Sequence, residues 1–208
     1  MDGKIVFPAE YDAMGSVNGH MITLLKNLKF GAYDVVRKKI IKPQFEKNVI
    51  VYNNYWMVAY QKGYFGFVDW EAKPASKFEF DEVQYWNDST ALVKRKSDWY
   101  IYDIRQKKNI ESFIKEITVI AESPEEKLCI IKQGDFYGVI SNKRGFVIPA
   151  TFTKLINLGS ADVPLYFTEK HVEEALLFVV IYYSHDGKLL YRQVYEEEDY
   201  GKILCNNE

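Results

Sequence analysis

Short runs of apolar residues alternate with turn-forming residues along most of this chain. The runs are about four to seven residues long, they are bounded by Gly, Pro, Asn, Asp or Lys, and a turn signal returns about every eight to twelve residues. Clear examples are residues 56–60, 91–94 and 128–132. Short β-strands produce this pattern, because tight turns need residues with special backbone geometry. The pattern therefore predicts an all-β chain.

A longer period is superimposed on these strands. An aromatic residue followed by apolar residues and, in most copies, an acid recurs at spacings of 35, 34 and 38 residues. The aromatic positions are Phe30, Phe65, Trp99 and Tyr137. Glycine follows the aromatic residue in three copies, as Gly31, Gly66 and Gly138. A glycine inside a strand predicts a bulge or the close approach of another backbone, with the neighbouring ring covering the gap.

Further elements complete each copy of the unit. An apolar strand follows the aromatic motif and carries a proline in two copies, Pro43 and Pro149. We place both prolines at strand ends, where the missing N–H can face solvent. A related element opens the chain at residues 3–11, and an acidic and apolar stretch is clearest at residues 80–86.

A unit of this length holds three or four short strands and cannot bury its own apolar face. Stacked neighbours can bury it, so stability is expected to come from packing between repeats. The sequence predicts a tandem array of about five short antiparallel β-meander repeats. We favour an open twisted stack, because propeller blades usually span about 40–45 residues; a small propeller-like ring is the alternative.

The pattern weakens towards the C-terminus. We expect regular repeats over residues 1–156, and a divergent insertion followed by a terminal capping repeat over residues 157–208. Residues 157–176 break the repeat, and their second part could hold a short helix. A terminal cap is the favoured interpretation of this region, and a functional loop is the alternative.

The repeated order of residues resembles a known family. The unit begins with an aromatic residue, Gly, an apolar residue and Asp. A Gly-Lys turn, an apolar strand with Pro, and Phe/Tyr-Asp-Glu-Val follow. This order is similar to the WG-containing repeat of bacterial proteins. Residues 80–93 match its second half and residues 133–155 its first half. The Trp of the family name is mostly Phe or Tyr here, and Tyr100 replaces the glycine of one copy. The resemblance implies a β-rich scaffold for interactions, without assigned catalytic or ligand residues.

Composition and charge narrow the range of partners. Aromatic residues make up 16% of the chain, which favours strands, and the net charge is −2. Nucleic-acid binders usually carry a basic surface, so no nucleic-acid partner is expected. No apolar segment predicts an export signal or a membrane span, and Cys129 and Cys205 stand far apart. We therefore expect a cytoplasmic protein with reduced thiols and no membrane partner.

Catalytic and metal-binding patterns are not found in the sequence. The three histidines are widely separated and form no HExxH motif, and no phosphate-binding or nucleophile motif occurs. Asp34, Asp69 and Asp103 recur at one place in the repeat, before a turn, where an acid typically bonds its own turn backbone. We expect no metal, no cofactor and no enzymatic activity.

The most plausible binding residues are aromatic and amide side chains between the third and fourth strands of the unit. Tyr and Trp are enriched at interaction hot spots, and loops between strands are common sites of recognition. Trp86 is expected to be buried, with the neighbouring loop tips exposed. The candidate binding residues are Tyr52, Asn53, Asn54, Tyr55, Tyr85, Asn87 and Asp88.

These observations favour a non-enzymatic interaction module whose partner is another protein. A sharper hypothesis is an immunity-type protein that neutralises a toxin, which would predict a basic partner. The alternative is a carbohydrate or cell-surface binding module, since arrays with stacked aromatic residues suit that role. An enzyme would need a deep pocket with converging acids of perturbed pKa.

Overall fold

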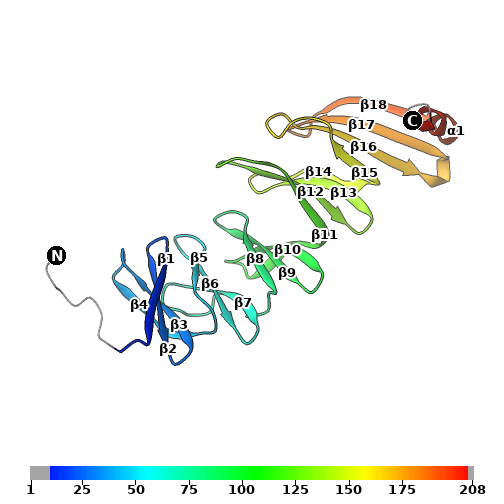
Figure 1. Cartoon of the computed structure of the whole chain (residues 1–208). Helices are drawn as coiled ribbons and strands as arrows, with labels where there is room; N and C mark the ends of the chain where they lie inside the picture. The colour runs from blue at the N-terminus through cyan, green and yellow to red at the C-terminus, as the bar shows by residue number, and fades with distance from the viewer. Residues whose placement is uncertain (1–9, 206–208) are drawn as a thin grey trace. The chain divides into compact units, whose positions relative to one another are not determined.

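The computed structural model describes the backbone of residues 10–205, and the side chains within that range except those of residues 16–18 and 203–205. The described residues form eighteen strands, a 3-10 turn and one α-helix (Figure 1). All strand pairs are antiparallel, and no sheet closes on itself. The predicted fold class, an all-β array of antiparallel meanders, is confirmed. Residues 3–9 of the predicted opening element lie outside the described range.

The chain divides into two compact units, Met1–Ser112 and Phe113–Glu208. Strand β11 (Lys108–Glu122) runs across this division. The boundary predicted after residue 156 falls within β15 (Lys154–Asn157) and does not coincide with the division between the two compact units.

The first unit contains three meanders. The first sheet has the order β1-β2-β3-β4, the second β5-β6-β7, and the third begins with β8-β9-β10. Their bounds are β1 (Ala13–Asn18), β2 (Met21–Lys26), β3 (Lys29–Asp34), β4 (Lys39–Phe45), β5 (Ile50–Val51), β6 (Met57–Gln61), β7 (Tyr64–Val68), β8 (Glu82–Tyr85), β9 (Thr90–Arg95) and β10 (Asp98–Asp103). In the second meander, isolated bridges from Pro74 and Phe80 to β7 take the place of a fourth strand.

The second unit contains two meanders. Its strands are the rest of β11, then β12 (Lys127–Gln133), β13 (Phe136–Ser141), β14 (Gly145–Phe152), β15 (Lys154–Asn157), β16 (Leu165–Val172), β17 (Leu177–Ser184) and β18 (Leu189–Glu196). Helix α1 (Glu197–Cys205) follows β18 and packs on β17 and β18.

The segment 157–176, expected to be an insertion, instead belongs to the last sheet. It holds the loop after β15, all of β16, and a 3-10 turn at Glu173–Ala175, to which the expected short helix is reduced. The interpretation as an insertion was wrong because β16 follows a two-residue alternation. Tyr166 and Thr168 are buried on one face, and Phe167 and Glu169 lie on the other.

The four aromatic positions of the repeat have equivalent surroundings, as predicted. Each is the second residue of the third strand of its meander and is half-buried. Each pairs across the preceding hairpin with the second-last residue of the strand before it. The pairs are Phe30 with Leu25, Phe65 with Tyr60, Trp99 with Lys94, and Tyr137 with Lys132. Tyr100, in the glycine position, leaves its hairpin register intact.

Two of the glycines after these rings, Gly31 and Gly138, are required by close backbone contact. A Cβ at Gly31 would lie 2.3 Å from the Ile41 carbonyl oxygen, and one at Gly138 would lie 2.7 Å from the Ile148 carbonyl oxygen. The register between the third and fourth strands shifts at both glycines, which marks a bulge. The predicted close approach is therefore confirmed.

The two prolines lie inside β4 and β14 rather than at the strand ends, which corrects the prediction. Each lies in the bulge opposite its glycine, where the regular ladder is already interrupted. Both strands are the last in their sheets. A missing N–H is tolerated at a bulge on an edge strand, so the bulge explains Pro43 and Pro149.

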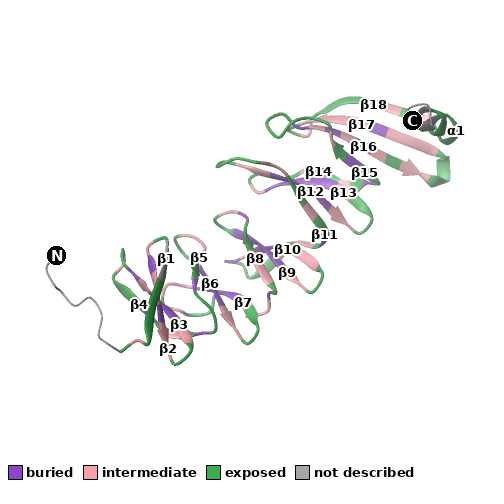
Figure 2. Ribbon diagram, viewed as in Figure 1, coloured by how far each residue is buried: buried purple, intermediate pink, exposed green. Residues whose placement is uncertain are grey.

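Apolar clusters join successive meanders within each unit. One cluster combines Met21 and Phe45 of the first meander with Met57 and Val68 of the second. Another combines Phe67 of the second meander with residues of the third, and a third cluster joins the two meanders of the second unit. Figure 2 shows the buried segments on inner strands such as β6, β9 and β13. The structure thus confirms that neighbouring repeats bury each other's apolar faces.

Candidate functional site

Two equivalent loops of the first unit are shaped by asparagine side chains. The Asn53 Oδ1 atom accepts hydrogen bonds from the backbone N–H groups of Tyr55 (2.7 Å) and Trp56 (2.8 Å). The Asn87 Oδ1 atom accepts from the N–H groups of Ser89 (3.0 Å) and Thr90 (2.9 Å) in the next repeat. These are Asx turns, in which a short polar side chain replaces a backbone acceptor. Both asparagines are therefore occupied by their own loops.

The two loops are also tied to one another. The Tyr52 hydroxyl donates to the carbonyl oxygen of Thr90 at 2.6 Å and accepts from the N–H of Trp86 at 3.2 Å. The Asn53 Nδ2 atom donates to the carbonyl oxygen of Asp88 at 2.7 Å. Burial raises the pKa of Tyr52 far above its usual value, so the phenol stays neutral and can donate. The structure thus brings the candidate residues together, and Tyr52 links the two repeats.

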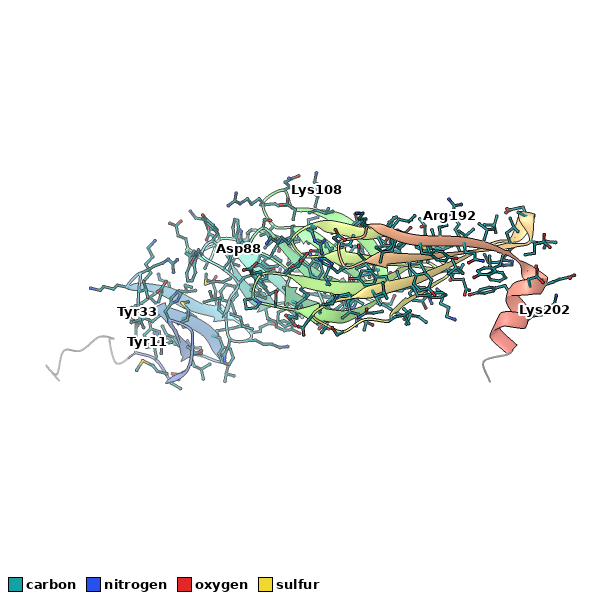
Figure 3. All side chains as sticks on the ribbon, turned by 90° about the horizontal axis from the view of Figure 1, so that it is seen from above. Tyr11, Tyr33, Asp88, Lys108, Arg192 and Lys202 are labelled. Atoms are coloured by element: carbon teal, nitrogen blue, oxygen red, sulfur yellow. The ribbon has the colours of Figure 1, made fainter. Side chains whose placement is uncertain are left out.

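Four of the candidate residues, Asn54, Tyr55, Tyr85 and Asp88, are exposed around these tied loops. Tyr55 is 56% exposed, and the Arg105 guanidinium lies 5.2 Å from the centre of its ring. Tyr85 is 50% exposed, and its hydroxyl donates to Asp88 Oδ1 at 2.9 Å. Burial and the Asp88 carboxylate both raise the pKa of Tyr85. Asp88 lies at the loop tip labelled in Figure 3.

Asn54 and Trp86 complete the site in different ways. The Asn54 carbonyl oxygen accepts a hydrogen bond from Trp70 Nε1 at 2.8 Å, and the Arg37 guanidinium lies 3.8 Å from the centre of the Trp70 ring. Trp86 is 3% exposed, which confirms that it is buried. The backbone of Asn54 is thus held by the neighbouring turn, while its side chain is exposed.

An apolar pocket of about 410 Å³ lies beside Tyr52 and Tyr85. Strands β5 and β8 border it, and each is the last strand of its sheet. Glu82 is the charged residue among those that line it. The lining residues are Ile50, Val51, Tyr52, Val58, Phe65, Glu82, Val83 and Tyr85. The hydroxyl groups of both tyrosines are engaged outside the pocket lining, with Thr90 and Asp88.

The sequence prediction missed most of this pocket. Ile50 and Val83 were not among the candidates, because apolar residues in short strands are ordinary core residues in a repeat protein. Glu82 was not a candidate either. Their exposure depends on two sheet edges facing one space, which is a tertiary property. The structural cause is the shortness of β5, which has only two residues and leaves Ile50 46% exposed.

The recurrent acids have the structural role that their repetition predicted. Each accepts hydrogen bonds from backbone N–H groups of its own turn, and Ser141 does so in the fourth copy. The bonds join Asp34 to Val36 and Arg37, Asp69 to Glu71 and Lys73, Asp103 to Gln106, and Ser141 to Lys143 and Arg144. Repetition therefore indicated turn chemistry correctly.

The histidines and the described cysteine show no arrangement for metal binding. His20 stacks on Trp70 with ring centres 5.6 Å apart, and His171 stacks on Phe178 at 4.4 Å. Within residues 10–205, no group of three or more His, Cys, Asp or Glu side chains could hold a metal ion. Cys129 is a buried free thiol, and burial raises its pKa to about 12. The side chain of Cys205 lies outside the described part of the chain.

Among the described helices and turns, none is long and apolar enough to cross a membrane.

Comparison with known proteins identifies distant structural similarities. No family model matches the chain, and no curated protein matches it. The chain is similar to KlHsv2 with loop 6CD replaced by a Gly-Ser linker, at 9% identity and a TM-score of 0.41, covering 91% of this chain and 71% of that one. It is similar to a eukaryotic initiation factor at 11% identity and a TM-score of 0.44, covering 90% of this chain and 66% of that one.

A third similarity is to a quinonprotein alcohol dehydrogenase-like protein from Bacteroides thetaiotaomicron. The identity is 14% and the TM-score 0.31, covering 92% of this chain and 56% of that one. The chain thus spans about two thirds or less of the last two proteins. At these values the comparisons do not indicate a function, and the proposals below rest on this chain's own residues.

Proposed function

We propose that the chain is a protein-binding module, and that its binding surface is the pocket between β5 and β8 together with the ring of Tyr85. The observation that carries this proposal is an apolar pocket with a half-exposed tyrosine at its mouth. Interaction hot spots are enriched in Tyr and lie in pockets that a partner side chain can fill and dry. The WG-like repeat pattern, which implies an interaction scaffold, supports the same role.

The chemistry of the pocket favours a protein partner over a carbohydrate. A sugar needs several hydrogen-bonding groups around an aromatic platform, whereas this pocket offers mainly aliphatic and aromatic side chains. Both tyrosine hydroxyls already have partners. An apolar side chain of a protein is therefore the better match. A toxin neutralised by this chain is one such partner.

Removal of the pocket mouth tests the proposal. A double variant, Ile50→Ser with Tyr85→Ala, should weaken binding of the native partner at least tenfold, because hot-spot truncations typically cost about 2 kcal/mol. The partner would be captured from the native host, purified, and titrated by calorimetry against wild type and variant. Phe136→Ala, which removes a 43% exposed ring in the second unit, is the matched control. Equal affinity of wild type and double variant would refute the assignment of this surface.

A further inference from the structure

We propose that two copies of this chain pair through β18, as antiparallel neighbours related by a two-fold axis at Val194. This inference goes beyond the proposed function, because β18 belongs to the second unit and contributes no residue to the pocket between β5 and β8. Three features of β18 carry it: an open backbone edge, apolar side chains exposed along that edge, and a charge order that is complementary to itself in the antiparallel direction.

The outer edge of β18 carries free backbone groups. β18 pairs with β17 and is the last strand in the order β15-β16-β17-β18. Just beyond its end, the Glu197 N–H donates to the Leu176 carbonyl oxygen. Because bonded and non-bonded positions alternate along an antiparallel pair, Arg192, Val194 and Glu196 direct their N–H and C=O groups away from β17. Among the residues that the structure describes, none bonds to these outward groups.

Helix α1 leaves this edge uncovered, because it turns inward over one face of the sheet. Its first residue, Glu197, has a carboxylate oxygen 3.6 Å from Nε2 of His171 in β16. The Tyr200 ring stacks on Phe178 of β17 with ring centres 4.5 Å apart, and the Tyr200 hydroxyl donates to the Glu169 carboxylate of β16 at 2.5 Å. The helix therefore runs from β18 towards β16, away from the outer edge.

Most of β18 is a regular edge that presents apolar side chains. Natural sheet edges are commonly blocked by proline, lysine or bulges, and β4 and β14 each carry a proline within a bulge. The register shift of β18 lies between Leu189 and Tyr191, and the residues from Tyr191 to Glu196 pair with β17 without interruption. In this regular part Tyr191 is 52% and Val194 45% exposed (Figure 2). The edge is therefore available for strand pairing.

The charges of β18 match those of a second copy. Its charged residues are Arg192, labelled in Figure 3, and Glu196, and neither forms an ion pair within the described part of the chain. In an antiparallel pair centred on Val194, Arg192 of each copy lies opposite Glu196 of the other. These are the positions whose backbone groups point outward, so the same register forms the hydrogen bonds and two ion pairs. Directly opposed unlike charges stabilise strand pairs.

The acids that follow β18 do not oppose this pairing. The two-fold axis places residues 196–199 of one copy beside residues 189–192 of the other, so the two acidic ends lie at opposite ends of the interface. Glu197 lies beside His171, and Asp199 accepts a hydrogen bond from Lys202 at 2.9 Å. Parallel pairing in register would instead set Glu196 against Glu196, and directly opposed like charges destabilise strand pairs. The charge order therefore selects the antiparallel arrangement.

Charge exchange across the axis tests the pairing. In sedimentation velocity the full chain should form dimers at micromolar concentration. Arg192→Glu alone and Glu196→Arg alone should each raise the dimer dissociation constant about tenfold, because each sets like charges opposite one another at two places. An equimolar mixture of these two variants should dimerise as wild type does, since positions 192 and 196 again carry opposite charges across the axis.

The mixture also shows that both single variants are folded. Lys154→Glu, on the opposite edge of the same sheet, is the matched control and should leave dimerisation unchanged. A wild-type chain that stays monomeric, dimers that neither single variant weakens, or a mixture that fails to dimerise would overturn the proposal.

A cysteine at the axis tests the register. Residues of a hydrogen-bonded antiparallel pair have Cα atoms about 5.5 Å apart, which is within the range of a disulfide. In a Cys205→Ser background, Val194→Cys should give a disulfide-linked dimer on mild oxidation, seen by non-reducing electrophoresis. Val179→Cys, opposite Val194 in β17 of the same copy, should not, because it lies one strand further from the axis. Equal cross-linking of both variants, or none in Val194→Cys, would overturn the register.

Discussion

Single residues of this chain divide into those whose role is local and those whose role depends on the neighbouring repeat. Asn53 and Asn87 shape their own loops, and Asp34 and Asp69 bond their own turns. Such roles can be predicted from the sequence, because the partners lie within a few residues. Tyr52 was predicted only as a binding residue, since its hydrogen bonds join residues 34 and 38 positions away.

Tyr52→Phe should destabilise the first unit by about 1–2 kcal/mol. The variant keeps the buried ring but leaves the Thr90 carbonyl oxygen and the Trp86 N–H without the hydroxyl group. Urea denaturation followed by tryptophan fluorescence measures the loss. Tyr55→Phe, at a ring that is 56% exposed, is the control and should change stability by less than about 0.5 kcal/mol.

Leu28→Gly should stabilise the protein by about 1 kcal/mol. Leu28 occupies the two-residue hairpin between β2 and β3 with φ of 59° and is 85% exposed, so its side chain strains the backbone without packing. Thermal denaturation would show the increase. Leu28→Ala removes the same exposed apolar atoms but keeps the strain, and an equal gain in both variants would contradict this explanation.

The pH dependence of stability should include a contribution from Asp34. Burial alone would raise the pKa of Asp34, but hydrogen bonds from Arg37 and Val36 and the nearby His20 lower it overall. Because the folded-state pKa is the lower one, the stabilisation is complete above the unfolded-state pKa of about 3.9 and is lost as pH falls through the folded-state value. Denaturation of wild type and Asp34→Asn should therefore differ at pH 7 and converge as the pH falls below the folded-state pKa of Asp34.

At the scale of elements, the sequence predicted the strands and their repetition more reliably than the irregularities. The glycines were identified as sites of close approach, but the prolines were misplaced because a bulge inside β4 and β14 cannot be seen in one strand alone. Residues 157–176 were misjudged because they contain no aromatic-glycine pair like Phe30-Gly31 or Tyr137-Gly138. The side chains of β16 nevertheless alternate regularly, and β16 pairs with β17.

Gly138→Ala should destabilise the protein by about 1–3 kcal/mol. The added methyl group would lie 2.7 Å from both the Ala150 nitrogen and the Ile148 carbonyl oxygen, and backbone atoms can move away only by distorting the bulge. Gly201→Ala is the control, because a Cβ there meets nothing within 4 Å and alanine favours the helix. A stable Gly138→Ala protein would show that the strands can separate at little cost.

At the scale of the whole molecule, the need for neighbouring repeats could be predicted from the unit length, whereas the pocket could not. The three apolar clusters described above each combine residues of two successive meanders. The pocket arises because β5 has only two residues and β8 ends its sheet, so two edges border one space. Its existence depends on how the second and third meanders pack, and no local pattern encodes that packing.

Phe67→Ala tests this dependence between repeats. Phe67 is fully buried, and its ring contacts Tyr52 and Phe80 in its own repeat and Tyr102 in the next. The truncation should cost about 3–5 kcal/mol. Because stability in repeat arrays is shared through nearest-neighbour interfaces, amide hydrogen exchange should accelerate in β9 and β10 as well as in β6 and β7.

Phe152→Ala, in the cluster of the second unit, should instead accelerate exchange in β13 to β17. Faster exchange confined to β6 and β7 in Phe67→Ala would mean that each meander is stable by itself, and the pocket between β5 and β8 would then not depend on their packing.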